Sequence, residues 1–222
     1  MTERELYLKI KPLLEGYTEG LFWDFKKTLS DTGEIIRDIL AFSNSHHSED
    51  SFIIVGVSES VSPQKNHKVK LSTEDRRRLN TDAKYLYLPG KWDVHGLTAG
   101  EIDTMRKFSE QLSQQLACSM LICQPKCEYI PVSIGKKRWL YVVIIKSVPG
   151  VFLSNKDIPQ ERNGNKIAVK QSVMYVRIAD TTIGARTDVA SATEYIRVWR
   201  EYITWLKKSG SSMLNIEGNI DE

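Results

Sequence analysis

Acidic side chains near the N-terminus are the residues best suited to chemistry. Glu19 and Asp24 lie five residues apart, and Glu59 comes two residues after the apolar run Phe52-Ile-Ile-Val-Gly-Val57. Hard divalent cations take oxygen ligands, usually a few carboxylates together with water. A cation held in this way activates water and stabilises charge that develops on a phosphoryl group. The three acids therefore predict a catalytic site that binds Mg²⁺ or Mn²⁺.

Two lysines, Lys26 and Lys27, follow Asp24 after one phenylalanine. The aromatic, β-prone segment 21–26 predicts a strand, in which Asp24 and Lys26 point to the same face. Adjacent strands lie about 5 Å apart, so pairing of this strand with segment 52–57 brings Asp24 and Glu59 within reach of one cation. Lys26 would then neutralise the scissile phosphate. The competing interpretation is that the acids are surface carboxylates in ordinary salt bridges.

Several other chemistries lack their usual motifs. The sequence has no G-x-x-x-x-G-K-[ST] and no G-x-G-x-x-G, so no ATP site or dinucleotide site is evident. It also lacks H-E-x-x-H and the G-x-S-x-G elbow of acyl hydrolases. The spacing of Cys118, Cys123 and Cys127 matches no strong zinc pattern. Metal-assisted phosphate chemistry is therefore the hypothesis that the motifs favour.

Composition and charge are those of an ordinary globular protein with a basic body. The net charge is +3, and the last 14 residues hold three acids and no lysine or arginine, so residues 1–208 carry +6. A basic body is compatible with nucleic acid as a partner. No apolar stretch is long enough to span a bilayer, and no signal-peptide pattern is present, which predicts a cytoplasmic protein. The Ser/Gly/Asn-rich tail, 209–222, is predicted to be disordered.

The periodicity of the chain predicts one α+β domain over residues 1–208, with a mixed β-sheet flanked by helices. Capping boxes begin helices at Ser72 and Thr98, and Asp188 is the expected cap of the last helix. Turns are expected at 31–33 and 135–138, and a loop at 88–96. The expected helices cover residues 3–14, 34–44, 73–78, 98–116 and 189–208. The expected strands cover residues 21–26, 52–57, 119–123, 128–134, 139–146 and 173–178.

The last expected helix is amphipathic, and its apolar residues are predicted to face the core. These residues are Val189, Ile196, Trp199, Ile203 and Leu206.

Basic residues outside the acid cluster form candidate contacts to phosphate. Salt-sensitive binding to a nucleic-acid backbone requires such side chains. The alternative for the run 76–78 is a solvated helix face, and the alternative for the run 136–138 is an ordinary charged turn. The candidates are Arg76, Arg77 and Arg78 on the short helix, Lys136, Lys137 and Arg138 in the turn, and Arg177 and Arg186 near the C-terminal strand.

The order and spacing of short motifs resemble the Schlafen-type AlbA_2 domain over about residues 12–206. The chain reads Glu19-x4-Asp24-Phe-Lys26, then Ile39-Leu-Ala-Phe-Ser-Asn44, then Ile53-Ile-Val-Gly-Val57. The family typically reads E-x4-E-F-K, then A-F-A-N-T-x-G-G, then a strand ending in G-V and an acid. The run Met174-Tyr-Val-Arg177 is similar to the family's tyrosine-valine-arginine strand.

This resemblance implies a metal-dependent endoribonuclease. Nuclease-type Schlafen proteins cut tRNA and rRNA with three acids and Mg²⁺ or Mn²⁺. The family's acids correspond to Glu19, Asp24 and Glu59, although Asp24 is shorter and Glu59 longer than the usual residue. Structured RNA such as tRNA is the implied substrate, DNA remains an alternative, and a toxin or phage-defence setting is the implied context.

Two departures from the family pattern keep other functions open. The glycine pair after Asn44 is replaced by Ser45-His-His-Ser-Glu-Asp50, and the vertebrate zinc site has no counterpart, so no zinc is expected. Many bacterial relatives are regulator modules described as DNA-binding or ATP-binding. A non-catalytic nucleic-acid-binding module and a regulator with a protein partner therefore remain alternatives. Because family nucleases have two similar lobes, a homodimer is expected here, and an activating partner protein is a further expectation.

Overall fold

The computed structural model describes residues 1–15, 20–45, 49–59, 67–70, 72–79, 85–88, 92–161, 166–180 and 184–209. Its helices are α1 (Glu3–Glu15), α2 (Thr32–Asn44), α3 (Thr73–Leu79), α4 (Ala99–Ser119) and α5 (Ala192–Lys208). Its strands are β1 (Trp23–Lys26), β2 (Ser51–Val55), β3 (Val57–Glu59), β4 (His67–Lys70), β5 (Tyr85–Leu88), β6 (Trp92–Val94), β7 (Cys127–Gly135), β8 (Arg138–Ile145), β9 (Ile158–Pro159), β10 (Ile167–Val169), β11 (Tyr175–Asp180) and β12 (Gly184–Val189). Apart from Ser209, the predicted disordered tail lies outside the described residues.

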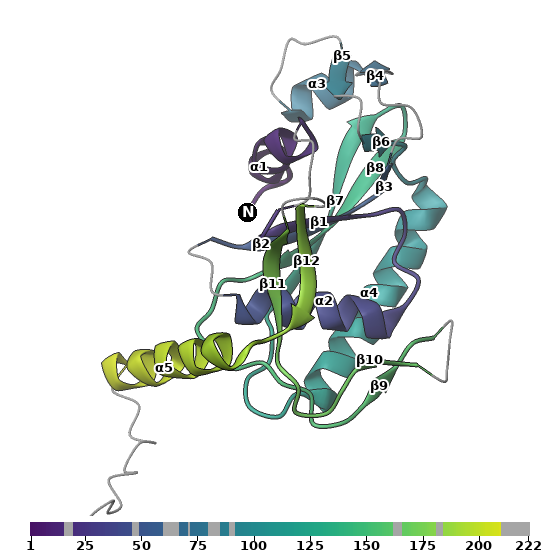
Figure 1. The fold of residues 1–222 in the computed structure, drawn as a ribbon. Coiled ribbons are helices and arrows are strands. Elements are labelled where there is room, and N and C mark those ends of the chain that lie inside the picture. The colour runs from purple at the N-terminus through teal and green to yellow at the C-terminus, as the bar shows by residue number, and fades with distance from the viewer. Residues whose placement is uncertain are drawn as a thin grey trace, which may run out of the picture.

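A four-stranded mixed sheet forms the centre of the fold, in the order β1-β2-β8-β7 (Figure 1). β1 runs parallel to β2, whereas β2 pairs with β8, and β8 with β7, in the antiparallel sense. The prediction that segment 52–57 is a central strand is confirmed for β2, whose residues are all buried. The predicted α+β class with a mixed sheet is confirmed.

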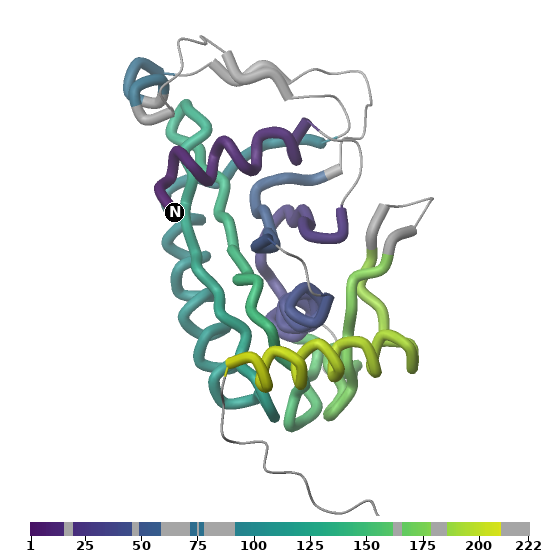
Figure 2. Tube along the Cα trace, turned by 90° about the vertical axis from the view of Figure 1, so that its left-hand side faces the viewer, coloured from purple at the N-terminus to yellow at the C-terminus, as the bar shows by residue number. Residues whose placement is uncertain are grey.

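Helices cover both faces of this sheet, so alternate residues of β2 enter two different hydrophobic cores. Ile53 and Val55 pack in the core that contains α2 and α4. Phe52 and Ile54 pack in the core that contains α1, on the other face. Figure 2 shows α1 above the sheet strands and α2 on the opposite side of them. Phe25 belongs to the α1 core, so its neighbours along β1 must point toward α2.

The start of α2 differs from the prediction. Segment 31–33 was expected to be a turn, but the helix begins at Thr32 and Asp31 is its N-cap. The Asp31 carboxylate accepts a hydrogen bond from the backbone N–H of Glu34 at 3.1 Å. An aspartate at the N-cap satisfies one of the free N–H groups of the first helical turn. Aspartate is also common in turns, but at this position it begins a helix.

Three further boundary predictions are wrong. Segment 119–123 is not a strand, because α4 continues to Ser119 and Met120 forms only an isolated bridge with Ser154. Segment 88–96 contains the strand β6 within the expected loop. The cap of α5 is Ser191, which forms a capping box with Glu194. Asp188 instead lies in β12, opposite Val176.

The predicted hairpin at 135–138 and the capping box at Thr98 are confirmed. Lys136 and Lys137 adopt left-handed φ angles of 51° and 56° between β7 and β8, as a tight turn matching strand twist requires. Thr98 and Glu101 cap each other's backbone at the start of α4.

Val189 was expected on the last helix but is the final residue of β12, where it is 56% exposed. The inward placement of α5 side chains is wrong for Ile196 and Ile203, which are 56% and 40% exposed. None of the helices in the described part of the chain combines the length and apolar character needed to cross a bilayer.

Candidate functional site

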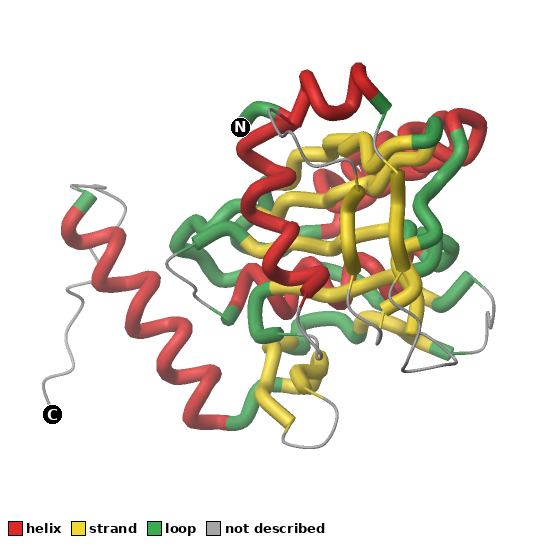
Figure 3. The backbone as a smooth tube through the Cα atoms, turned by 90° about the horizontal axis from the view of Figure 1, so that it is seen from above, coloured by secondary structure: helices red, strands yellow, loops and turns green. Residues whose placement is uncertain are grey.

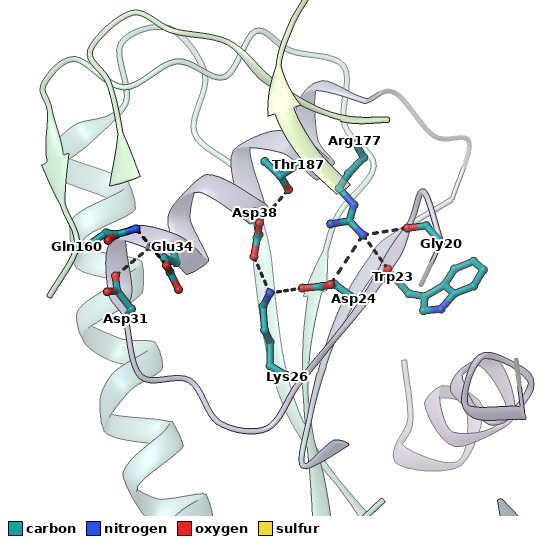
Figure 4. A network of polar contacts seen from close by, with 10 residues as sticks. All are labelled: Gly20, Trp23, Asp24, Lys26, Asp31, Glu34, Asp38, Gln160, Arg177 and Thr187. Carbon is teal, nitrogen blue, oxygen red and sulfur yellow. Dashed lines mark hydrogen bonds and ion pairs between the residues drawn. The ribbon is translucent and has the colours of Figure 1, made fainter. Parts of the chain in front are cut away.

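Asp24 is the centre of a charged cluster between β1 and α2 (Figure 4). Its carboxylate is buried, and its Oδ2 atom lies 2.6 Å from Nζ of Lys26. The same Nζ atom lies 3.0 Å from Oδ2 of Asp38, which projects from α2. Two carboxylates from two elements therefore converge on one cationic atom. The shared face of Asp24 and Lys26, predicted from strand alternation, brings both side chains toward α2.

Arg177 completes the cluster from the neighbouring strand β11. Its side chain is only 3% exposed, and one terminal nitrogen lies 3.8 Å from Oδ1 of Asp24. The same nitrogen donates hydrogen bonds to the backbone carbonyls of Gly20 and Trp23 at 3.2 and 3.4 Å. The guanidinium also lies over the ring of Phe42, 4.8 Å from its centroid. Arg177 therefore joins β11 to the start of β1 and to α2.

The adjacent strand β12 contributes Thr187, whose hydroxyl donates to Oδ1 of Asp38 at 2.9 Å. The hairpin of β11 and β12 is therefore tied to both acids, through Arg177 to Asp24 and through Thr187 to Asp38. Hydrogen bonds to a buried carboxylate compensate its lost hydration and fix its orientation.

Among the described ion pairs of the cluster, two carboxylates face two cationic side chains. Asp24 and Asp38 are the carboxylates, and Lys26 and Arg177 are the cationic residues. Burial by itself lowers the pKa of Lys26, but the carboxylates of Asp38 and Asp24 raise it above its ordinary value overall. The ammonium form of Lys26 is therefore the form that the site stabilises.

We expect Lys26→Met to lower the free energy of unfolding by about 3 kcal/mol at pH 7. Removing one partner of a buried ion pair costs about 3–5 kcal/mol, and the side chain of Lys26 is 31% exposed, which favours the lower end of that range. Because the folded-state pKa of Lys26 is raised, this stabilisation is complete below the unfolded-state pKa of about 10.4 and is lost at higher pH. Urea titrations at pH 7 and pH 9 should give the same difference in the free energy of unfolding between Lys26→Met and wild type. If this difference vanishes at pH 9, the ammonium of Lys26 is not the group that stabilises the fold.

The side chains of Glu19 and Glu59, the other predicted metal ligands, lie outside the part of the chain that the structure describes. Glu19 lies outside the described residues, and only the backbone of Glu59 is described, opposite Trp92 in β3. The backbone of Glu59 lies at the end of β3, beyond the C-terminal end of β2. Among the described side chains, no group of three or more His, Cys, Asp or Glu residues is placed to hold a metal. The three-acid site therefore stays a prediction.

The basic residues predicted to contact nucleic acid are mostly exposed, with one exception. Arg77 and Lys27 are exposed and Arg76 is half-buried, whereas the side chain of Arg78 is not among those described. Arg177 is inside the protein, and a direct phosphate contact would require it to leave the partners given above. Lys136, Lys137 and Arg138 are exposed in the β7–β8 turn, and Arg186 is exposed and paired with Asp188 at 3.1 Å.

The two basic runs lie at the same end of the molecule. α3 contacts β7, and the helix lies beside the β7–β8 turn in Figures 1 and 2. The helix that carries Arg76 and Arg77 therefore lies next to the turn whose cations are exposed. Sequence position alone did not reveal this, because about sixty residues separate the two runs.

Asp38 and Thr187 are site residues that the sequence interpretation missed. Asp38 was detectable in principle, since it stands with Arg37 between the apolar pairs Ile35-Ile36 and Ile39-Leu40, on a helix whose inner face is buried. A carboxylate among buried positions is seldom left unpaired. Thr187 gave no such signal, because threonine is common in exposed strands.

Asn44, in the segment that carried the family resemblance, holds the end of α2 against two other segments. Its side-chain amide donates to the carbonyls of Phe152 and Tyr175 at 2.9 and 3.1 Å, and its Oδ1 accepts from the N–H of Phe152 at 3.0 Å. All three bonds are buried, so Asn44 positions β11, the strand that carries Arg177.

We expect Asn44→Ala to lower the free energy of unfolding by about 3 kcal/mol, because it leaves several buried backbone groups without partners. Asn155→Ala is the matched control, since the amide of Asn155 makes an exposed bond to the carbonyl of Cys118. The control should change stability by less than about 0.5 kcal/mol. Equal effects of the two substitutions in urea unfolding would refute the positioning role of Asn44.

Comparisons with known proteins give structural similarity at low sequence identity. No protein family model matches the chain, and no curated protein matches it. One similar solved structure is the N-terminal domain of a protein from Nitrosomonas europaea that is named as related to the ATP-dependent DNA helicase RecG. That domain is 14% identical, and the alignment covers 67% of this chain and 74% of that chain with a TM-score of 0.38. The chain is similar to that domain over part of its length, and a similarity at this level carries no conclusion about function.

Proposed function

We propose that this protein binds nucleic acid and cleaves structured RNA, such as tRNA, with the help of a divalent metal at Asp24. The observation that carries the proposal is the convergence of Asp24 and Asp38 on one cationic atom, the Nζ of Lys26. This ammonium shows that the two carboxylates are arranged to surround a positive charge. The motif resemblance to nuclease-type Schlafen proteins gives the proposed reaction class.

The residues present suit Mg²⁺ or Mn²⁺. Mg²⁺ is usually held by one or two carboxylates, while waters and substrate phosphates fill its other positions. Asp24 and Asp38 supply two such carboxylates, and Glu19 and Glu59 remain proposed additional ligands. A bound divalent cation would supply Lewis-acid polarisation of the phosphodiester and a more acidic water.

The chain's own residues would divide the remaining tasks. Arg177 and Thr187 keep Asp24 and Asp38 in place, through contacts that do not involve Lys26. Lys26 is partly exposed and has a flexible stem, so it can turn from the carboxylates to a phosphate oxygen of the substrate. Exposed cations of α3 and of the β7–β8 turn would bind the RNA backbone, as recognition of RNA by shape requires.

A non-catalytic nucleic-acid-binding protein is the second candidate. One specific observation favours it, since Lys26 and Arg177 already neutralise Asp24 and Asp38. A site satisfied in this way has no electrostatic need for a metal. In this case the cluster serves only to join β11 and β12 to the sheet.

A cleavage and binding assay separates the two candidates. Purified protein would be incubated with total tRNA, single-stranded DNA and double-stranded DNA, with Mn²⁺, with Mg²⁺, or with EDTA. The proposed function predicts cleavage of tRNA that requires metal and stops with EDTA. Salt-dependent binding to RNA or DNA without cleavage under any metal would refute the nuclease and support the second candidate. Absence of both binding and cleavage would exclude both.

A further inference from the structure

The C-terminal helix α5 stands out from the body of the protein. It crosses the near side of the molecule in Figure 2 and lies apart from the sheet in Figure 3. Only Val198 is buried along its 17 residues. Val198 packs in a small apolar cluster that includes Leu153 and Val176, and Trp199 and Tyr202 pack against the same cluster. Most of the surface of α5 therefore faces away from the fold.

The outward side of α5 is basic. Four cationic side chains lie along the helix, of which Arg200, Lys207 and Lys208 are exposed and Arg197 is half-buried. Arg197 pairs with Glu201 at 3.3 Å, one turn along the helix. Arg200 and Lys208 are eight residues apart and so share one side of the helix, about 12 Å apart along its axis. We name Arg197, Arg200, Lys207 and Lys208 the basic face of α5.

An aromatic ring lies beside these cations. Trp205 is 41% exposed, and its ring stacks near that of Tyr202, with an interplanar angle of 14°. Trp205 also lines a shallow hollow of about 310 Å³ together with Arg200, Glu201, Thr204 and Lys208. A partly exposed indole ring that stacks near Tyr202 and shares a hollow with two cations offers both stacking and phosphate contacts.

This combination fits single-stranded nucleic acid better than other occupants. Every base has a flat face that stacks on an aromatic side chain, and lysine and arginine track the backbone. A second copy of this chain would use the exposed Ile196 and Ile203. Arg200 and Lys207 lie four residues after those two isoleucines and so flank them on the helix surface. Packing two copies there would bring like charges together.

We propose that the outer side of α5 is a binding site for single-stranded RNA, in which a base stacks on Trp205 and phosphates contact Arg200 and Lys208. The site deepens the proposed function and rests on it, because it presumes that the protein binds RNA. It lies on a different element from Asp24 and from the basic runs of α3 and the β7–β8 turn. It would hold an unpaired segment of a structured RNA while the rest of the substrate contacts those surfaces.

Binding of a fluorescein-labelled 20-nucleotide oligouridine in EDTA, followed by fluorescence anisotropy, tests the site without cleavage. Trp205→Ala should weaken binding about tenfold, whereas Trp205→Phe should keep most of the affinity because it keeps a stacking ring. Arg200→Ala combined with Lys208→Ala should reduce the slope of log K against log salt by about 1.4, since each lost phosphate contact to a single strand contributes about 0.7. Circular dichroism would show that each variant is folded.

Lys107→Ala is the matched control. Lys107 is an exposed lysine of α4, and α4 lies behind the molecule in the view in which α5 lies in front (Figure 2). If wild type binds oligouridine and the α5 variants bind equally well, the α5 site is refuted and the proposed function stands. If the α5 variants bind oligouridine as wild type does but differ from it in oligomeric state, measured by sedimentation, then α5 is an interface between copies of the chain. If wild type binds neither oligouridine nor tRNA, the proposed function fails together with the site.

Discussion

Arg177→Met should lower the free energy of unfolding by about 3–5 kcal/mol, the scale for removing one member of a buried charge pair. The substitution leaves the buried carboxylate of Asp24 with less compensation on its Oδ1 side. It also removes the donor that the carbonyls of Gly20 and Trp23 accept from. Methionine fills much of the volume of arginine, so the substitution leaves little cavity. The loss of stability therefore comes mainly from the missing charge and the missing hydrogen bonds.

Urea unfolding followed by circular dichroism measures this effect. Arg186→Met is the matched control on the paired strand β12, because Arg186 is exposed and contacts only a surface acid, Asp188, in the ion pairs described. Exposed pairs contribute about 0–1 kcal/mol. Arg177→Lys should lower the free energy of unfolding by an amount between those of Arg177→Met and Arg186→Met. Lysine keeps the charge but lacks the planar guanidinium that reaches several oxygens. If Arg177→Met lowers the free energy of unfolding no more than Arg186→Met does, the buried contacts of Arg177 do not stabilise the fold.

Asp24→Asn should reduce metal-dependent cleavage of RNA by about a hundredfold or more, the scale seen when one preorganised electrostatic group is lost from an active site. Asparagine has nearly the same shape and keeps an oxygen atom near Arg177. It lacks the negative charge that a divalent cation requires. Cleavage should therefore fall far more than the folded fraction does.

Initial rates of tRNA cleavage in Mn²⁺ measure this effect, with the melting temperature as a measure of folding. Asp38→Asn should show a comparable loss, because Asp38 is the second carboxylate at the same cationic atom. Asp103→Asn makes the same chemical change at a carboxylate that is 67% exposed on α4 and should leave the rate unchanged. Full activity in folded Asp24→Asn would show that the cleavage site lies elsewhere.

Local patterns in the sequence determined several of the elements and the buried sides of β1 and β2. Alternation along segment 21–26 placed Asp24 and Lys26 on one face, and the continuous apolar run of β2 indicated a strand buried on both faces. Both predictions depend on the period of the backbone, which is a property of neighbouring residues. The capping box at Thr98 is equally local, since its two partners are three residues apart.

Boundaries were less well determined where one residue type serves two local structures. Asp31 and Asp188 illustrate this. Aspartate is favoured both in turns and at helix N-caps, so Asp31 was assigned to a turn although it caps α2. Asp188 was assigned to a cap although it lies in β12, because Ser191 competes for the same role three residues later.

Only the tertiary structure decided which charges meet. Asp24, Asp38, Arg177 and Thr187 come from β1, α2, β11 and β12, and their contacts depend on how the hairpin of β11 and β12 packs against α2. Periodicity reports which side of an element is inward, but it does not identify the partner on the other side. The same limit applies to α5, whose amphipathic pattern predicted a buried face. The sequence alone determined that this face is apolar, whereas the folded chain decided that the body covers only the part around Val198.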